Sequence, residues 1–373
     1  MRKRKGIDLC TTRSNSRVSW KRLEIYLEEI SAGRGINLYI VRGLVAPLQM
    51  LNTAIVGLGW WGKTLVKSAR DFGAPLRVLR GITLEPETVR DFAAEHQIAL
   101  GTSLDEVLAD KSIQAVILAT PHTKHRAQVE AIAAAGKHIY CEKPFALSKA
   151  DAQAALDACR RAGIVIAVGH HFRLMPSMRV LAELKEKGAF GTIMHAEGNY
   201  SHDWLASYPA DSWRLRTEES RAGGMTGMGI HVLDCFRDMV GPMKRISALS
   251  RARALKLETG DTTSVLIEFD NGATGTLATT MKTPFAWRVG IFGENCWAAS
   301  VSETRAIVRH AGKEPEAFDL PADNHLGRNL DYFAKAALGQ GKFPISPDGI
   351  LQTAAALEAV FKSVDANGAW MTV

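Results

Sequence analysis

The stretch of this chain that decides its fold is Thr53-Ala54-Ile55-Val56-Gly57-Leu58-Gly59-Trp60-Trp61-Gly62. A short β-branched and apolar run leads directly into a G-x-G-x-x-G pattern and then into a helix-like segment. In such a turn Gly57 allows the tight bend, Gly59 lets the backbone approach a diphosphate, and Gly62 lets the helix pack against the strand. The helix start offers free N–H groups to the phosphates. We interpret the segment, with Trp60 and Trp61 inside it, as a dinucleotide-binding turn, although glycines at this spacing also occur in ordinary turns.

Strand-like and helix-like segments alternate regularly after this turn, which is the pattern of a parallel sheet covered by helices. Residues 115–119 form a continuous apolar run, as a strand buried on both faces should. Ser103 and Ser148 stand where helix N-caps are expected, each followed three residues later by an acidic residue. The pattern predicts a Rossmann domain with a doubly wound parallel sheet over residues 50–170. The expected strands are 53–56, 76–83, 115–119, 138–141 and 164–168, and the expected helices begin near 62 and span 87–96, 103–109, 124–135 and 149–162.

The texture of the chain changes after residue 170 to longer alternating segments. Residues 262–269 and 273–280 alternate on either side of Asn271-Gly272, which is a strong hairpin signal. A similar segment covers 192–200, and a helix is expected near 348–365. Residues 171–373 are therefore predicted to form a second, α+β domain with a largely antiparallel sheet.

Composition excludes several classes of protein. The net charge of +7 is concentrated in residues 1–49, which hold ten basic and four acidic side chains and leave 36 basic and 35 acidic ones for the rest. The nearly neutral body argues against a nucleic-acid partner, because a phosphate-binding surface needs a clustered basic face. Five scattered cysteines without a C-x-x-C pair indicate a reducing cytoplasm. No apolar run reaches the roughly eighteen residues of a membrane span, so we expect no membrane association.

Residues 1–49 are expected to be an extension outside the fold. They begin Met-Arg-Lys-Arg-Lys, and Met50 stands directly before the first convincing strand. We expect this extension to be disordered or to result from an upstream start. A transit peptide is the alternative, since the region is rich in arginine, but Glu24, Glu28 and Glu29 count against it.

The first chemistry-bearing segment after the glycine turn is Ala119-Thr120-Pro121-His122-Thr123-Lys124-His125. It follows a predicted parallel strand, and ligands of doubly wound sheets bind outside such strand ends. Thr120, Pro121 and His125 are therefore candidate cofactor-loop residues. The alternative is that Pro121 only breaks the strand and Thr123 only caps a helix. We expect no metal ion, because the two histidines have no evident third ligand nearby.

The next predicted strand ends in Cys141-Glu142-Lys143-Pro144. A lysine at such a strand end can lose contact with water, which lowers its pKa and suits it to acid–base work or to hydrogen bonding a substrate oxygen. Most lysines are simply solvated, but Pro144 stiffens the exit from the strand and would fix the direction of Lys143.

The third segment, residues 222–234, is a glycine-rich entry into a helix that carries His231 and Asp234. A histidine at this place is a candidate acid–base group. A core histidine bonded to Asp234 is the equally weighted alternative.

Taken in order, these motifs resemble the Gfo/Idh/MocA oxidoreductase family over about residues 51–373. The glycine turn, the Thr-Pro loop, the Glu-Lys-Pro tripeptide and the His231 segment all stand where that family's pattern expects them. The resemblance implies a Rossmann domain, a second domain with an open antiparallel sheet that binds substrate and mediates oligomerisation, NAD or NADP, and oxidation of a carbinol or reduction of its ketone. Sugars and cyclic polyols are frequent substrates in that family, and members usually form homodimers or homotetramers through the open sheet.

Two departures from the family pattern concern the site. Many members carry an aspartate four residues before the histidine, where this chain has Gly227. His170, His171, Arg173 and Arg214 are candidate replacements, and each could equally be structural. The acidic residue expected at the end of the second strand is replaced by Thr83. Since an acid there would bind the ribose hydroxyls and repel a 2′-phosphate, the choice of cofactor stays open. Glu85 slightly favours NAD, whereas an inward-turned Arg80 would favour NADP.

The sequence thus predicts an NAD(P)-dependent dehydrogenase or reductase acting on CH–OH groups, with Lys143 and His231 as catalytic residues. His231 is expected to be the general base and Lys143 to polarise the same oxygen. Arg173, Trp213 and Arg214 are expected to join them in binding a small-molecule substrate. The rival predictions are a non-catalytic nucleotide-dependent sensor on the same fold and an NAD-assisted glycoside hydrolase. The expected cofactor-binding residues are Gly57, Gly59, Trp60, Trp61, Gly62, Thr83, Thr120, Pro121, His125, Glu142, Lys143 and Pro144.

Overall fold

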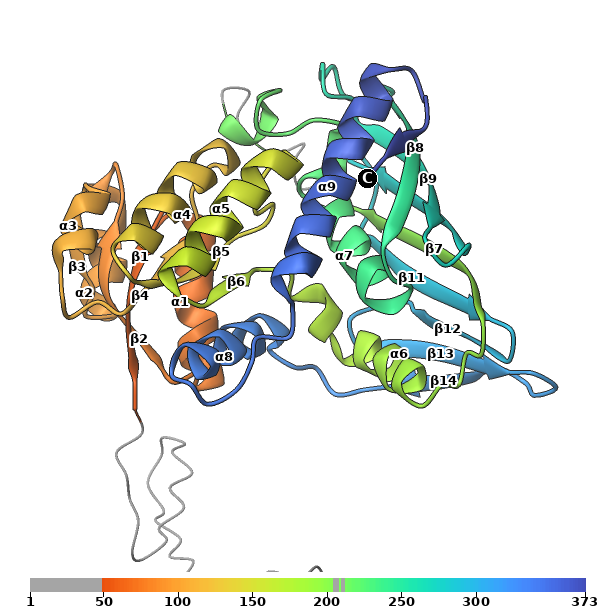
Figure 1. Ribbon diagram of the computed structural model, residues 1–373, viewed down its shortest axis with the longest axis horizontal. Coiled ribbons are helices and arrows are strands. Elements are labelled where there is room, and N and C mark those ends of the chain that lie inside the picture. The colour runs from red at the N-terminus through yellow and green to blue at the C-terminus, as the bar shows by residue number, and fades with distance from the viewer. Residues whose placement is uncertain (1–48, 204–207, 209–211) are drawn as a thin grey trace, which may run out of the picture. The chain divides into compact units, whose positions relative to one another are not determined.

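The structure is a computed structural model that describes residues 49–203, 208 and 212–373. The expected extension, residues 1–49, therefore lies outside the described residues except for its last one. Within the described residues, six parallel strands form one sheet in the order β3-β2-β1-β4-β5-β6 (Figure 1). This order reverses between β1 and β4, and such a switch point is where doubly wound sheets bind ligands. The strands are β1 (Leu51–Val56), β2 (Leu76–Ile82), β3 (Ala99–Gly101), β4 (Ala115–Leu118), β5 (His138–Cys141) and β6 (Ile166–Val168).

Helices connect these strands as the sequence predicts. Ser103 and Glu106 form a complete capping box at the start of α3, and Ser148 caps α5 by accepting a hydrogen bond from the Asp151 backbone. Gly163 ends α5 in the left-handed conformation. The helical segments are α1 (Trp60–Phe72), η1 (Pro86–Val89), α2 (Arg90–Glu95), α3 (Leu104–Ala109), η2 (His122–Lys124), α4 (His125–Ala134) and α5 (Lys149–Ala162).

Two local features differ from the sequence-based expectation. The helix expected over 87–96 is a 3-10 turn followed by α2, since Pro86 begins the turn and Val89 departs from helical geometry. The strand β3 was not expected, because its three residues carry no apolar run that would mark a strand. It exists through its parallel pairing with β2 at the sheet edge.

A second sheet of nine strands is formed by described residues beyond 190, in the order β14-β13-β12-β11-β7-β10-β9-β8-β15. All its neighbouring pairs are antiparallel except β7 with β10. The Asn271-Gly272 turn joins β9 to β10, which confirms the predicted hairpin. The strands are β7 (Ile193–Ser201), β8 (Met243–Arg251), β9 (Thr262–Phe269), β10 (Thr274–Thr280), β11 (Ala286–Gly293), β12 (Cys296–Ser300), β13 (Arg305–His310), β14 (Glu316–Asp319) and β15 (Met371–Thr372).

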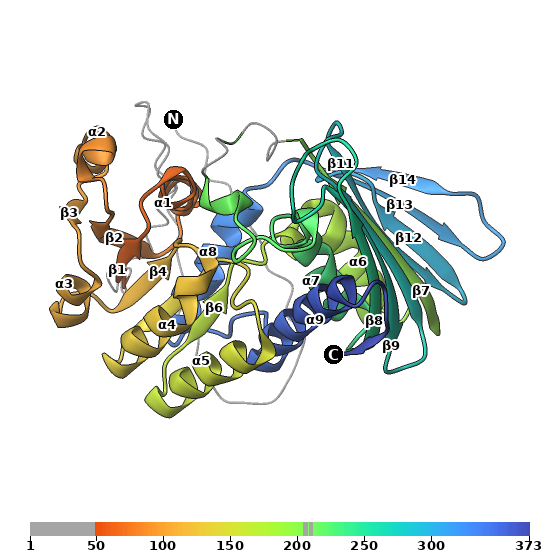
Figure 2. The same ribbon diagram turned by 90° about the horizontal axis from the view of Figure 1, so that it is seen from above.

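Helices α6, α7 and α9 lie on one side of this sheet, as the view from above shows (Figure 2). Their apolar side chains form one core with the inward-facing residues of β7 to β13, including Phe236, Phe269 and Trp287. The remaining helical segments are η3 (Phe172–Leu174), α6 (Pro176–Glu186), η5 (Trp213–Leu215), η6 (Gly223–Met225), α7 (Gly229–Met239), α8 (His325–Ala337) and α9 (Pro347–Asp365).

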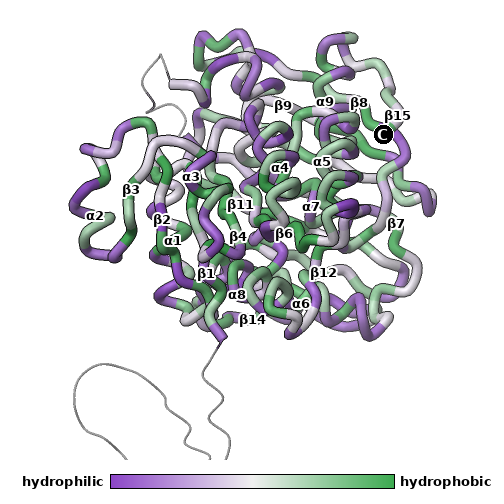
Figure 3. The backbone as a smooth tube through the Cα atoms, turned by 60° about the vertical axis from the view of Figure 1, so that its left-hand side comes forward, coloured by the Kyte–Doolittle hydropathy of each residue, from purple (hydrophilic) through white to green (hydrophobic). Residues whose placement is uncertain are grey.

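The C-terminal helices return to the parallel sheet. Leu330 and Phe333 of α8 pack into the core between α1 and the sheet, while Ile350 and Ala354 of α9 join the core on its other side. Two layers of helices therefore bury the parallel strands, and the apolar run of β4 shows as a hydrophobic segment inside the chain trace (Figure 3). Among the described residues, no helix combines the length and the apolar character needed to cross a membrane.

Candidate active site

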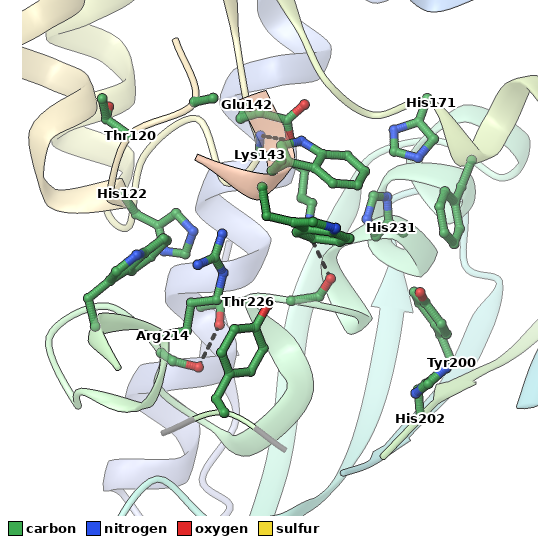
Figure 4. A pocket seen from close by; sticks show the side chains of 18 residues that line it. Thr120, His122, Glu142, Lys143, His171, Tyr200, His202, Arg214, Thr226 and His231 are labelled. Atoms are coloured by element: carbon green, nitrogen blue, oxygen red, sulfur yellow. Dashed lines mark hydrogen bonds between the residues drawn. The ribbon is translucent and has the colours of Figure 1, made fainter. Parts of the chain in front are cut away.

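A cavity of about 510 Å³ opens at the carboxyl ends of the parallel strands (Figure 4). One side is built from the start of α1 and the ends of β4, β5 and β6. The other side comes from β7, Tyr208, the segment 213–227 and α7. The lining residues are Trp60, Trp61, Ala119, Thr120, His122, Glu142, Lys143, His171, Phe172, Tyr200, His202, Tyr208, Trp213, Arg214, Ser220, Thr226, Gly227 and His231.

The glycine turn leaves space beside this cavity. Gly57 has a φ of +95°, and a Cβ there would collide with the Ala119 carbonyl. A Cβ on Gly62 would collide with the Gly57 carbonyl, so these two glycines hold the turn against β4 and β1. A Cβ on Gly59 would meet nothing within 4 Å. The free space over Gly59, together with an α1 N-terminus that no described side chain caps, fits the diphosphate of a dinucleotide.

The Thr120 loop has two histidines in different settings. Nδ1 of His122 donates to the Glu219 carbonyl at 2.9 Å, and burial lowers the pKa of His122 to about 3, so this ring is neutral. His125 is fully buried outside the cavity, with its ring nitrogens 2.8 Å from the Pro144 carbonyl and 3.1 Å from the Thr120 carbonyl. His125 therefore joins the two loops, whereas the histidine that reaches the cavity is His122. Pro121 precedes the η2 turn and does not line the cavity.

The Glu-Lys-Pro segment places two ionisable groups at the end of β5. Glu142 is buried, with 5% of its surface exposed, and burial raises its pKa to about 7 against the opposing effects of Lys143 and the Trp61 indole. Lys143 extends into the cavity and donates from Nζ to the Gly227 carbonyl at 2.9 Å. Burial lowers the pKa of Lys143 to about 8, opposed by Glu142 and assisted by Arg214. Pro144 follows with a cis peptide bond.

Two neutral imidazoles face the same cavity. His231, in the first turn of α7, is 3% exposed and stacks on Phe172 at 4.1 Å between ring centroids. Its Nδ1 has no hydrogen-bond partner within the described structure, and the Asp234 carboxylate is bound by Arg173 instead. His171 follows β6, and its ring centroid lies 5.4 Å from that of His231. Burial lowers the pKa of both rings well below the ordinary histidine value.

The structure corrects the expected role of Arg173. Its guanidinium donates to Asp234 from Nε at 2.8 Å and to Asp238 from Nη1 at 2.9 Å, and it does not line the cavity. The side chain is nearly buried, and ion pairing with Asp234 raises its pKa against the effect of burial. Because both carboxylates already hold the guanidinium, Arg173 is a structural link between η3 and α7 and is not free to bind substrate.

The Trp213–Arg214 pair is part of the cavity wall. The Arg214 guanidinium stands 4.3 Å from the Trp213 ring centroid and 5.4 Å from that of Tyr208. No carboxylate among the described residues pairs with Arg214. Trp213 also meets His122 edge to face at 5.2 Å. A half-buried, unpaired guanidinium beside aromatic rings is suited to an anionic group.

The end of β2 lies outside the cavity. Thr83 accepts a hydrogen bond at Oγ1 from the Glu85 backbone and donates its own N–H to the Gly101 carbonyl. Arg80 pairs with Glu106 at 2.9 Å and lies 3.9 Å from Asp110. Arg80 is thus not turned inward toward a nucleotide.

Sequence reasoning did not single out several lining residues. Phe172 and Ser220 carry no motif of their own, and Thr226 lies in the glycine-rich segment 222–234 without having been assigned a role. The Ser220 and Thr226 hydroxyls lie 2.9 Å apart in the cavity wall. His122 belongs to the Thr-Pro loop, and its position next to Pro121 was the sequence signal that could have identified it as a cavity residue. The structure brings eight of the expected residues to the cavity wall, namely Trp60, Trp61, Thr120, Glu142, Lys143, Trp213, Arg214 and His231.

Two family models match this chain. Residues 51–170 match the oxidoreductase family with an NAD-binding Rossmann fold, and residues 178–299 match the GFO/IDH/MocA C-terminal domain. The chain belongs to the Gfo/Idh/MocA family of oxidoreductases.

Curated members of the family include sugar-acting enzymes. Levoglucosan dehydrogenase of Pseudarthrobacter phenanthrenivorans is 31% identical over 211 residues, which cover 54% of this chain and 54% of that protein. The 1,5-anhydro-D-fructose reductase of Ensifer adhaerens is 25% identical over 280 residues, covering 74% of this chain and 77% of that protein. The matched part of the chain spans about half the length of several curated relatives, such as levoglucosan dehydrogenase.

Solved structures of the family share the fold. Levoglucosan dehydrogenase in complex with NADH and levoglucosan matches with a TM-score of 0.80 at 23% identity, over 87% of this chain and 100% of that one. The WlbA dehydrogenase from Bordetella pertussis, in complex with NADH and UDP-GlcNAcA, matches with a TM-score of 0.77 at 23% identity, over 87% and 98% of the two chains. At this identity the likeness establishes the fold of this family member.

Proposed function

We propose that this chain is an NAD(P)-dependent dehydrogenase or reductase that acts on a CH–OH group of a small hydroxylated substrate. The observation that carries the proposal is the position of Lys143. This lysine stands at the end of a parallel strand, reaches the opposite wall at Gly227, and shares one cavity with His231. Lys143 thus contacts both the strand-end side of the cavity, where we expect the cofactor, and the α7 side, where we expect the substrate.

The expected nicotinamide cofactor would be held by the glycine turn and the strand ends. Gly59 leaves room for the diphosphate, and Trp60, Trp61 and Thr120 line the adjoining wall. Glu142 and Lys143 stand at the inner end, toward the substrate half. When bound, the cofactor supplies a nicotinamide carbon that exchanges a hydride with the substrate carbon.

Lys143 is the group that we assign to the reacting oxygen. With its pKa lowered to about 8, it is mostly protonated at neutral pH and can donate to the substrate oxygen. A positive N–H donor in a site with little water stabilises an oxygen that becomes negative as it loses its proton. Such electrostatic and acid–base help contributes about two to four orders of magnitude in rate.

His231 is assigned to the same region of the substrate. Its ring is fixed by stacking on Phe172 and lies beside Tyr200, whose ring centroid is 6.0 Å away. To serve as the expected general base through Nε2, it must carry its proton on Nδ1, the atom that has no partner among the described residues. We therefore assign His231 to contact with the substrate.

The substrate is proposed to be a polyol, a sugar or a related hydroxylated ring. Aromatic side chains such as Trp61, Phe172 and Tyr200 line much of the cavity, and such faces pack well against the C–H surface of a ring. Two relatives are named for levoglucosan and 1,5-anhydro-D-fructose, which are compounds of this kind. Arg214 is assigned to an anionic group, which the cofactor diphosphate or a substrate carboxylate would supply.

For the cofactor, we propose a preference for NAD over NADP. Arg80 is engaged by Glu106, so the end of β2 offers no free guanidinium to a 2′-phosphate, and Glu85 adds a negative charge nearby. Titration with NADH and NADPH tests this preference. A Thr83→Asp variant should weaken NADPH binding further, while tighter binding of NADPH than NADH by the wild type would refute it.

We also propose a homodimer or homotetramer formed through the open sheet. One face is covered by α6, α7 and α9, while the other exposes Met194, Leu249 and Leu266, and a hollow of about 700 Å³ crosses it. An uncovered apolar sheet face of this kind is a common site of association. Sedimentation equilibrium should give an oligomer that Leu266→Lys weakens, and a monomeric wild type would contradict it.

The proposed function is tested by a screen of polyols, anhydrosugars, sugars and hydroxy acids with both oxidised and reduced cofactors, followed by nicotinamide absorbance. We expect stoichiometric oxidation or reduction of at least one compound. Tight cofactor binding without turnover of any compound would identify the sensor instead. A cleaved glycoside without net change in the cofactor would identify the NAD-assisted hydrolase.

A further inference from the structure

Two histidines that line the cavity differ in the hydrogen bonding of their Nδ1 atoms. In His171, Nδ1 lies 3.0 Å from the Gly169 carbonyl. A carbonyl can only accept, so Nδ1 of this ring carries the proton. In His231, Nδ1 is buried and has no partner among the described residues. The structure thus specifies the tautomer of His171 but leaves that of His231 without a fixing contact.

The tautomer of His171 determines what its other nitrogen can do. With the proton on Nδ1, Nε2 carries a lone pair and acts only as an acceptor in the neutral ring. Within the described residues nothing donates to this atom, and the ring is part of the cavity wall. Nε2 is therefore an unused acceptor of a ring whose residue is only 3% exposed. A substrate hydroxyl would satisfy it, whereas a carbonyl or carboxylate oxygen would not.

The same reasoning gives His231 a different role. If Nε2 of His231 were the acceptor, an N–H would be buried at Nδ1 with no described acceptor. A buried N–H donor without a partner is costly. The ring avoids this cost when Nδ1 keeps its lone pair and the proton is on Nε2. His231 then donates from Nε2, as Lys143 donates from Nζ.

The ring of His171 is held rigidly. It stacks with His325 at 5.1 Å and with Trp61 at 6.0 Å, and its neighbour Phe172 meets it edge to face at 4.9 Å. These contacts come from the start of α8, the start of α1 and η3. Fixed orientation is what a hydrogen-bonding group in a reaction site requires, because a misplaced donor or acceptor loses much of its effect.

Resting on the proposed function, we propose that Nε2 of His171 is the acceptor of the substrate hydroxyl proton. Its fixed tautomer lets it take the place of the aspartate that the family pattern expects at Gly227. The hydroxyl donates to Nε2, and as the O–H bond breaks the proton passes to Nε2 and the electron pair stays on the oxygen. Lys143 and His231 donate to that oxygen. His171 thus becomes an imidazolium whose Nδ1–H still donates to the Gly169 carbonyl.

The first test needs no substrate. Protein labelled with ¹⁵N-histidine gives distinct nitrogen shifts for protonated and bare ring nitrogens, and the His171→Gln and His231→Gln variants assign the two rings. In the NADH complex we expect a protonated Nδ1 and a bare Nε2 for His171. A His171 ring protonated at Nε2 would overturn the proposal.

The second test separates hydrogen bonding from proton transfer. The amide oxygen of His171→Gln can accept a hydrogen bond near the position of Nε2 but cannot hold the proton. With the best substrate of the screen, we expect kcat to fall by about 100-fold or more while KM changes by only a few-fold. His195→Gln on β7, outside the cavity, is the matched control and should behave as wild type.

The outcomes separate this proposal from the proposed function. If His171→Gln keeps normal kcat while Lys143→Met is inactive, the proposal is wrong and the dehydrogenase stands. If the wild type binds NADH but oxidises nothing, the proposed function is wrong, and the nitrogen shifts still decide whether Nε2 of His171 is free of a proton. NADH titration of both glutamine variants verifies that each still folds and binds.

Discussion

Nζ of Lys143 donates a 2.9 Å hydrogen bond to the backbone carbonyl of Gly227 and so links the end of β5 to the segment before α7. The family pattern expects a carboxylate side chain at position 227, but a carbonyl adds no negative charge there. Burial therefore lowers the pKa of Lys143 to about 8, with only Glu142 acting against it. The lysine changes its charge within the range where enzymes commonly work.

A carboxylate restored at position 227 should move the pH dependence of turnover. In the proposed mechanism the protonated lysine donates to the substrate oxygen, so activity falls as the pH rises through the pKa of Lys143, about 8. An aspartate near the ammonium favours its charged form and raises this pKa. For Gly227→Asp we expect the alkaline limb of the pH–rate profile to shift upward by about one unit.

Gly227→Asn is the matched control for this experiment. It adds a side chain of nearly the same size without the charge, so its alkaline limb should stay close to that of the wild type. Equal shifts in the two variants would mean that Lys143 does not govern this limb.

The glycine turn offers a contrast between binding and stability. Gly59 has an extended backbone with a φ of −76°, and a side chain there would enter open space, so Gly59→Val should fold normally. It should abolish NADH binding, because the valine fills the space assigned to the diphosphate. Intrinsic tryptophan fluorescence during an NADH titration measures the effect, aided by Trp60 and Trp61 in the turn.

Gly57→Ala should show the opposite pattern. Its φ of +95° disfavours any side chain, and the new Cβ would collide with the Ala119 carbonyl. We expect a loss of about 1–3 kcal/mol in the free energy of unfolding. Unimpaired NADH affinity in Gly59→Val would show that the nucleotide does not bind at this turn, whatever the result for Gly57→Ala.

The buried carboxyl of Glu142 should make stability depend on pH. Burial raises its pKa from 4.5 to about 7, so between these values the folded chain binds a proton that the unfolded chain has lost. The contribution of Glu142 to stability then falls as the pH rises from about 4.5 to about 7, by up to about 3 kcal/mol, while the buried neutral histidines act in the opposite direction. The difference in the free energy of unfolding between the wild type and Glu142→Gln, measured by urea unfolding, should therefore fall over this pH range by that amount.

Glu258→Gln serves as the control, since Glu258 is exposed in the loop between β8 and β9. Its free energy of unfolding should follow that of the wild type at every pH. A difference between the wild type and Glu142→Gln that stays constant with pH would show that Glu142 does not bind the extra proton.

Most of the parallel-sheet half could be predicted because its signals are local. Apolar runs such as 115–118, glycine punctuation and Ser103 capping each lie within a few residues of the structure they specify. The missed strand β3 carries no such signal and depends on pairing with β2. In the second half, the Asn271-Gly272 turn was decisive for one hairpin, whereas the outer strands β11 to β14 lacked an equally strong marker.

The site could be predicted where motif residues point to a strand end, as Lys143 does. It could not be predicted where long-range pairing decides. In the sequence Arg173 is a basic residue near the site, but in the structure its guanidinium donates to Asp234 and Asp238. His125 and His122 differ by three residues, and only the fold turns one into the core and the other to the cavity.

Turnover by Lys143→Met tests the central claim most directly. The variant keeps the length of the side chain but lacks the ammonium, and Lys111→Met, at an exposed position, is the control. With the best substrate of the screen, the account predicts unchanged NADH affinity and turnover reduced by about 100-fold or more. Turnover close to that of the wild type would contradict the assignment of this cavity as a dehydrogenase site.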